Sequence, residues 1–114
     1  MSIDRELPYS KLRRHTRVHA DAPVGVHCRD RYRVHSMKEL SEGGLLFTSS
    51  ILYETGNKVD LSIVLPNEHI LMVPGEVVYV FKIRDSYHVG IRFESASDDV
   101  VETLKTYIEK EKRR

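Results

Sequence analysis

Apolar side chains occupy every even position from Val18 to Cys28, and this alternation constrains the fold more than any other feature of the chain. The odd positions between them hold polar or turn-forming residues. A side-chain period of two is that of a β-strand with one buried and one exposed face. We therefore predict a strand here, with a bend or bulge at Pro23 and Gly25. Arg17 has the parity of the exposed face and is predicted to point away from the core.

Shorter strand-like runs fill most of the remaining chain and are separated by turn residues. They span residues 32–37, 44–49, 59–65, 70–73, 76–81 and 87–93. The residues between the last two runs, 84–86, are typical of a hairpin connection. Short strands joined by turns favour an all-β fold, which we predict to be a small closed or nearly closed antiparallel β-barrel of about six strands. Closure also removes the exposed edges of strands rich in valine and isoleucine.

The hydrophobic period becomes that of an α-helix near the C-terminus. Apolar residues recur at helical spacing there, namely Val100, Val101, Leu104, Tyr107 and Ile108. Ser97, Asp98 and Asp99 are candidate N-caps, and Asp99 with Glu102 has the spacing of a capping box. We predict a helix over about residues 98–112 that covers one mouth of the barrel or packs on its wall. The alternative is a dimer or partner contact through the same apolar stripe.

The chain length suits one domain. Within the 114 residues we expect a flexible arm over residues 1–10 and a barrel with its helix over residues 11–114. No apolar stretch is long enough to cross a bilayer and no apolar leader is present, so we expect a cytoplasmic protein without membrane insertion. The single cysteine, Cys28, excludes an internal disulfide and fits a reducing compartment.

Positive charge is concentrated in the first third of the chain. The net charge is only +1 at pH 7, which argues against a general binder of polyanions. Residues 1–35, however, hold eight arginine and lysine residues against four acids. A local positive field of this kind suits a small dianion better than a long nucleic acid.

Two short segments, residues 13–17 and 39–44, carry complementary recognition chemistry. The first holds three arginines, whose planar guanidinium groups can bond the O6/N7 edge of guanine or a phosphate with two parallel donors. The second holds a carboxylate, a hydroxyl and a glycine pair, and a carboxylate accepts from the N1–H and amine of guanine. The candidate ligand-binding residues are Arg13, Arg14, Arg17, Glu39, Ser41, Gly43 and Gly44. The glycines either satisfy a turn that needs positive φ or bring the backbone close to a ligand.

The order and spacing of these two segments resemble the PilZ family, bacterial receptor domains for cyclic di-GMP. The family pattern is R-x-x-x-R followed by [D/N]-x-S-x-x-G, and Arg13 with Arg17 matches the first part. Ser41 and Gly44 match the serine and glycine of the second part, and Glu39 stands where the family has Asp or Asn. The longer Glu39 side chain is expected either to misplace its contact with guanine or to pair with one of the arginines. Both routes predict weaker ligand binding than the family pattern gives.

The resemblance implies a receptor or adaptor without enzymatic activity. Its ligand would be cyclic di-GMP, and an arginine arm that is loosely held without ligand would order around it. The output would act on an unidentified effector protein in trans, in motility, biofilm, secretion or pilus machinery. Leu12 stands where an arginine in the family accompanies a stacked nucleotide dimer, so we expect one ligand per chain. We expect a monomer or weak dimer.

The sequence leaves two alternative functions open and argues against two kinds of site, a metal site and a catalytic nucleophile. The first alternative is a PilZ-like adaptor that no longer binds nucleotide, favoured by Glu39. The second is a small-barrel binder of RNA or single-stranded DNA, which ranks third because most of the aromatic residues alternate as core positions do and Trp is absent. The six histidines lack metal-ligand spacing, and Ser41 and Cys28 lack the setting of a catalytic nucleophile.

Overall fold

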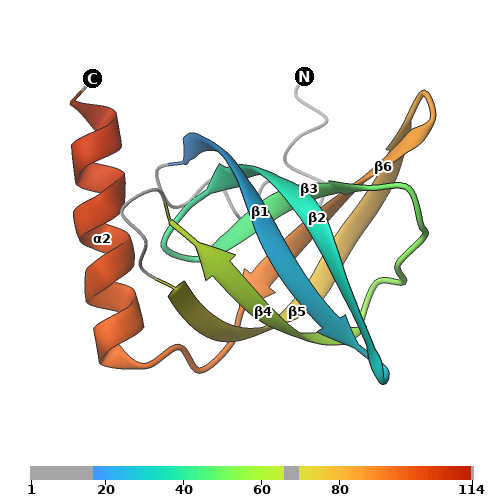
Figure 1. The fold of residues 1–114 in the computed structure, drawn as a ribbon, viewed down its shortest axis with the longest axis horizontal. Coiled ribbons are helices and arrows are strands. Elements are labelled where there is room, and N and C mark those ends of the chain that lie inside the picture. The colour runs from blue at the N-terminus through green and yellow to red at the C-terminus, as the bar shows by residue number, and fades with distance from the viewer. Residues whose placement is uncertain (1–16, 66–69, 114) are drawn as a thin grey trace, which may run out of the picture.

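The described part of the chain forms a closed barrel of six antiparallel strands, followed by helix α2 (Figure 1). This computed structural model describes residues 17–65 and 70–113. The elements are β1 (Val18–Cys28), β2 (Arg31–Leu40), β3 (Gly44–Ser49), β4 (Lys58–Val64), β5 (Ile70–Ile83), β6 (Ser86–Phe93) and α2 (Asp98–Lys112). Around the barrel the strands follow the order β1-β2-β3-β6-β5-β4. The predicted all-β barrel with a C-terminal helix is therefore confirmed.

The alternation of β1 is confirmed, but its irregularity lies elsewhere than the sequence predicted. Pro23 and Gly25 sit in regular register opposite Ser36 and Val34 of β2, and the shift falls between His19 and Ala22. A Cβ on Gly25 would meet the far end of the exposed Tyr32 side chain of β2, which would have to move aside. The bulge predicted at Pro23 and Gly25 is absent, since neither residue disturbs the pairing.

Strand β5 is one continuous strand rather than the two runs predicted around Pro74 and Gly75. The Pro74 carbonyl accepts a hydrogen bond from the Glu94 amide, just beyond the last residue of β6. In a strand the N–H and C=O of one residue point to the same side, so the missing proline amide faces the end of β6. Proline therefore costs no ladder hydrogen bond with β4, and the strand passes through it.

Two further bulges shift side chains onto the outer wall of the barrel. In β2 the register changes between Met37 and Glu39 against β3, and both Met37 and Leu40 are fully buried. The extra residue leaves Lys38 and Glu39 both outside the core. In β5 the register changes between Val77 and Tyr79, which places Tyr79 in a separate cluster outside the barrel core.

Helix α2 closes one mouth of the barrel (Figure 1). Its buried residues Leu104, Tyr107 and Ile108 belong to the same core cluster as the inward side chains of the strands. The apolar stripe is thus buried within the chain, as the covering role predicted. The N-cap is Ser97, one of the three predicted candidates, and its side chain accepts a hydrogen bond from the Val100 amide. The capping box predicted for Asp99 and Glu102 therefore does not form.

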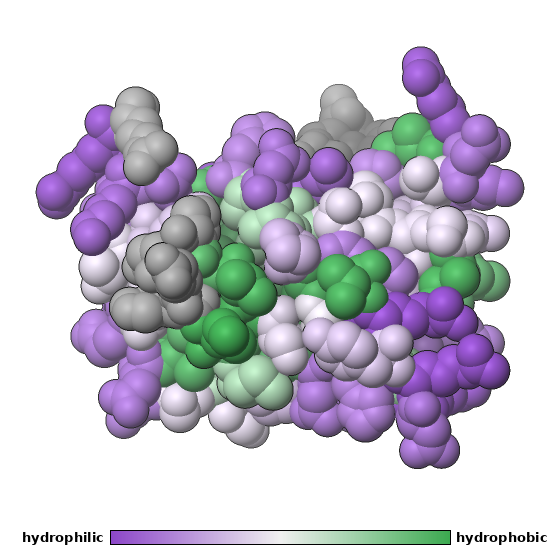
Figure 2. All heavy atoms as spheres, in the orientation of Figure 1, coloured by the Kyte–Doolittle hydropathy of each residue, from purple (hydrophilic) through white to green (hydrophobic). Residues whose placement is uncertain are grey.

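The outer wall over β4 and β5 carries exposed apolar side chains. Val64, Ile70 and Met72 are solvent-exposed, and Figure 2 shows apolar residues gathered on this part of the wall. In the first half of β5, apolar residues therefore occupy both faces of the strand. The odd positions face the core, and the even positions face outward. Within the described residues, no helix is long and apolar enough to span a bilayer.

Candidate functional site

Five of the seven predicted site residues lie in the described part of the chain. Arg13 and Arg14 lie outside the described residues. Arg17 directly precedes β1, and the adjacent pairing of Val18 with Leu40 brings it beside Glu39 on β2. Ser41, Gly43 and Gly44 form the turn into β3 and its first residue, so chain topology brings the two predicted segments together.

The Arg17 and Glu39 side chains form an ion pair at the centre of this group. Arg17 Nη1 lies 2.7 Å from Glu39 Oε1, and the two side chains are only 21% and 26% exposed. The contact lacks the N–H···O alignment of a hydrogen bond, so charge rather than a directed bond holds it. One of the two fates expected for the longer Glu39 side chain, pairing with an arginine, is therefore present in the structure.

The hollow beside the ion pair is nearly filled. Arg17, Glu39, Ser41, Gly44 and Tyr79 are among the residues that line it, and it holds about 10 Å³ of free space. That volume is about the least that a single water molecule needs. The hollow as it stands has no room for a ligand of nucleotide size.

The Ser41 hydroxyl is committed to the turn that follows β2. Its Oγ accepts from the amides of Gly43 and Gly44, at 3.2 and 3.1 Å, and donates to the Gly44 carbonyl at 3.2 Å. The Ser41 side chain is also buried. In this state the serine shapes the backbone beside the ion pair, as a hydroxyl in a serine turn does.

The glycines of this turn serve a close approach rather than an unusual backbone angle. Neither Gly43 nor Gly44 has a positive φ, so the first of the two roles considered for the glycines is not the one seen here. At Gly44 a Cβ would collide with the Ile91 carbonyl oxygen of β6. The Gly43 carbonyl also accepts from the Phe93 amide at 2.8 Å, so β6 holds the turn against the barrel.

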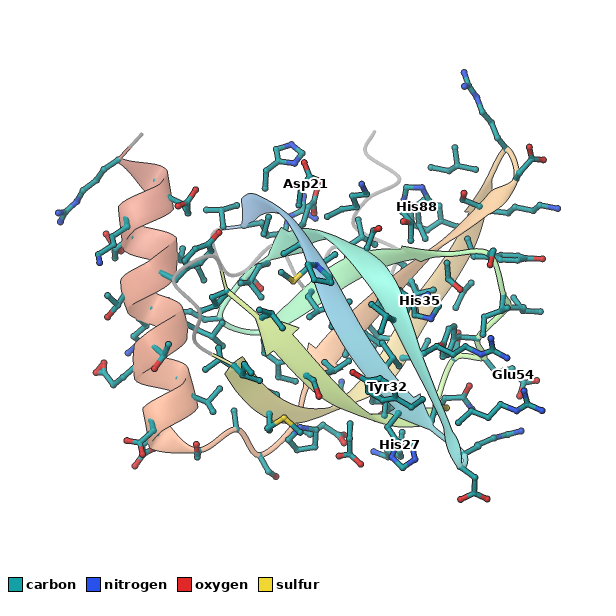
Figure 3. The ribbon with its side chains drawn as sticks, in the orientation of Figure 1. Asp21, His27, Tyr32, His35, Glu54 and His88 are labelled. Carbon is teal, nitrogen blue, oxygen red and sulfur yellow. The ribbon has the colours of Figure 1, made fainter. Side chains whose placement is uncertain are left out.

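Sequence reasoning missed an aromatic stack that begins at this hollow. The Tyr79 ring occupies the space where a Cβ on Gly90 would lie, and it packs with Leu46 outside the barrel core. Phe81 stacks on Tyr79 with ring centroids 5.6 Å apart, and His88 stacks on Phe81 at 5.2 Å. Figure 3 shows the His88 side chain on the outer side of the β5–β6 hairpin. Core-like alternation was predicted for most of the aromatic residues, and the β5 bulge is the reason that Tyr79 and Phe81 depart from it.

Four of the eight cations counted in residues 1–35 lie in the described residues, and these four are split between the two ends of β1. Arg17 precedes the strand, whereas Arg29 follows it, and Arg31 and Arg33 lie on the adjacent end of β2. No group of three or more metal-ligating side chains occurs in residues 17–65 and 70–113.

The fold is that of a small six-stranded β-barrel domain, with Arg17, Glu39 and the Ser41 turn on its outer wall. The chain belongs to the PilZ domain family, whose model matches residues 11–110. It is 29% identical over 110 residues to an uncharacterized protein of Aquifex aeolicus (strain VF5), covering 96% of this chain. The chain spans only about half, 54%, of that relative's length.

Solved structures with the same fold include three from other bacteria. The inhibitor of motility of Bacillus subtilis (MotI/DgrA) superposes with a TM-score of 0.78 at 16% identity, over 88% of this chain and 51% of that one. The PilZ domain of YcgR from Escherichia coli, solved with c-di-GMP, has a TM-score of 0.73 at 13% identity, over 88% and 91%. PlzA of Borreliella burgdorferi, in complex with c-di-GMP, has a TM-score of 0.60 at 18% identity, over 86% and 43%. At these identities the likeness concerns the fold.

Proposed function

We propose that this chain is a cyclic di-GMP receptor that signals to a separate effector protein. The observation that carries the proposal is the meeting of Arg17 and Glu39 beside the Ser41 turn, on the outer wall of the barrel. Family membership and the YcgR and PlzA structures solved with c-di-GMP support the choice of ligand.

The proposed chemistry divides the ligand between two kinds of group. Arg17, with Arg13 and Arg14 from the segment before it, pairs with phosphate oxygens or the O6/N7 edge of guanine through parallel donors. Glu39 accepts from the guanine N1–H and amine. The Ser41 turn sets the backbone close to the ligand, while its hydroxyl keeps the turn in shape.

Ligand binding then replaces the Arg17–Glu39 ion pair with contacts from each of these residues to the nucleotide. The Arg17–Glu39 pair fills the hollow in the absence of ligand, and the nucleotide takes over both partners when it enters. Ordering of the arginine arm around the ligand costs conformational entropy, which the charge-assisted bonds offset. The order–disorder change alters the surface that an effector meets, so no enzymatic step is required.

A calorimetric titration with cyclic di-GMP, GTP and a short single-stranded oligonucleotide tests the proposal. Arg13→Ala and Arg17→Ala are each expected to cost about 1–3 kcal/mol, or roughly five- to 150-fold in affinity for cyclic di-GMP. Arg31→Ala, an equal loss of charge beyond the far end of β1, is the matched control and is expected to leave affinity unchanged. The endpoint is expected at one ligand per chain. Unchanged affinity in the Arg13→Ala/Arg17→Ala double variant would refute the site.

The closed hollow also favours one second candidate, an adaptor of the same family that does not bind nucleotide. In that case Arg17–Glu39 is a permanent structural pair rather than a gate. The same titration separates the two, because a pure adaptor releases no heat with cyclic di-GMP either as the natural chain or as Glu39→Asp.

A further inference from the structure

The mouth of the barrel opposite α2 is closed by an aromatic plug. Tyr53, from the connection between β3 and β4, is buried there, and its hydroxyl lies 2.7 Å from His35 Nε2. The His35 ring stacks on Phe47 with centroids 4.8 Å apart and an interplanar angle of 4°. Figure 3 shows His35 and Glu54 toward this end of the barrel, away from the helix. The packed rings of Tyr53, His35 and Phe47 thus form the inner surface of this mouth.

A hollow of about 340 Å³ lies against this plug. Arg29, Arg31 and Arg33, from the end of the β1–β2 hairpin, are among the residues that line it, together with Glu54. Ile51 and Leu52 also line it, and Leu52 is 62% exposed. A volume of this size lies at the lower end of the range for binding pockets. The hollow therefore offers cations and apolar surface side by side.

Positive charge is in excess at this mouth. Arg29 Nη2 lies 3.5 Å from Glu54 Oε1, but both side chains are largely exposed, so the pair is weak. In the described part of the chain, no carboxylate lies within ion-pair distance of Arg31 or Arg33. Arg33 is half-buried, which limits the water that can screen it. Two guanidinium groups are thus available to an anionic partner.

The turn that carries Arg29 is held in a backbone conformation that glycine and asparagine usually occupy. Arg29 and Asp30 connect β1 to β2, with φ angles of 53° and 65°. A two-residue hairpin with both φ values positive strongly prefers Asn-Gly, and a left-handed residue other than glycine costs about 1–2 kcal/mol. Arg29 is a long, charged residue at a position that favours small ones, which indicates a role for its charge at the turn between β1 and β2.

We propose that this mouth docks an acidic, partly apolar peptide segment of a partner protein. Carboxylates of the segment pair with Arg31 and Arg33, and a neighbouring aliphatic side chain packs on Ile51 and Leu52. Guanidinium groups beside exposed apolar residues are the composition of protein interfaces, where arginine is enriched among the residues that dominate affinity. Because β1 separates this mouth from Arg17, docking does not require the proposed nucleotide site.

An NMR titration of the full chain, labelled with ¹⁵N and free of nucleotide, tests the proposal. The probe is the capped hexapeptide Glu-Glu-Leu-Glu-Glu-Leu, compared with Gln-Gln-Leu-Gln-Gln-Leu and with inorganic pyrophosphate. The acidic peptide is expected to shift the amide signals of Arg31, Arg33 and Leu52, with an affinity that falls as salt rises. Signals beside Glu39 are expected to stay in place.

Matched variants isolate the two arginines. Arg31→Gln/Arg33→Gln is expected to weaken peptide binding by about tenfold, the product of roughly threefold for each guanidinium–carboxylate pair. Lys105→Gln/Lys110→Gln, an equal loss of two charges on α2, is expected to change affinity by less than about twofold. Thermal unfolding of each variant verifies that the barrel is intact.

Three results would overturn the proposal. The first is equal binding of the glutamine peptide, which would show that the carboxylates are not recognised. The second is tighter binding of pyrophosphate than of the acidic peptide, which would make the mouth a phosphate site. The third is any sign that the peptide binds elsewhere, namely an unchanged affinity of Arg31→Gln/Arg33→Gln or peptide-induced shifts confined to another face.

Discussion

Replacement of Glu39 by Asp is expected to tighten cyclic di-GMP binding, because it weakens the contact that fills the proposed site. Glu39 Oε1 lies 2.7 Å from Arg17 Nη1. Aspartate keeps the carboxylate that accepts from guanine but is one methylene shorter. If the backbone does not move, the separation from the guanidinium grows by about 1.5 Å, to roughly 4.2 Å.

The size of the effect follows from Coulomb attraction over that change in distance. Between 2.7 and about 4.2 Å the attraction falls by roughly 2 kcal/mol at an effective dielectric constant of 20, and by about 0.5 kcal/mol at 80. These values correspond to about two- to thirty-fold in ligand affinity. Because about a quarter of each side chain is exposed, solvent screening places the expected gain at several-fold.

Calorimetry of the natural chain, Glu39→Asp and Glu39→Ala at two salt concentrations measures this gain. Glu39→Ala also releases Arg17, but it leaves guanine donors unpaired, so it is expected to bind no better than Glu39→Asp. Glu54→Asp makes the same chemical change at the far mouth and is expected to have no effect. Weaker binding by Glu39→Asp than by the natural chain would refute the reasoning, since the site would then be shaped for glutamate.

Three other predictions concern the barrel itself. Leu104→Ala is expected to lower the free energy of unfolding by about 2–5 kcal/mol in urea, because the side chain is fully buried beneath the helix. Gly44→Ala is expected to cost about 1–3 kcal/mol in the same assay, because its Cβ would meet the Ile91 carbonyl; no loss would contradict the close approach. Burial, and then the Arg33 charge, lower the pKa of His35, so the folded ring stays neutral where the unfolded ring takes a proton. Stability is therefore expected to fall as pH is lowered from 6.5 towards the folded pKa, and less steeply in His35→Gln.

Much of the fold was predictable because local patterns agree with the tertiary structure. The alternation in β1 and the helical spacing from Val100 to Ile108 each match the core positions observed. The bulges were not predictable, because an extra residue in one strand is defined only by the register of its neighbours. The continuity of β5 through Pro74 was also not predictable. Its missing amide faces a position where the neighbouring strand β6 has ended, and only the register of β6 shows this.

The sequence motif predicts which residues form the candidate site, but not how their side chains are arranged. Motif spacing identified Arg17 and Glu39, but their ion pair depends on the β2 bulge that keeps Glu39 on the outer wall. Ser41 was predicted beside a ligand, whereas its hydroxyl is used inside the turn. Tyr79 was missed, because only the β5 bulge moves it from the core to the wall beside the site.

The length of β1 determines how the two proposed sites can influence each other. The strand has 11 residues and one register shift, so Arg17 and Arg29 are separated by at most roughly 40 Å along it. At that distance the bound nucleotide and the docked peptide do not touch, and screened charge contributes little between them. Any coupling must be carried by the barrel, and thermodynamic linkage makes it reciprocal. The factor by which cyclic di-GMP changes peptide affinity must equal the factor by which the peptide changes nucleotide affinity, and a factor of one would make the barrel a rigid spacer.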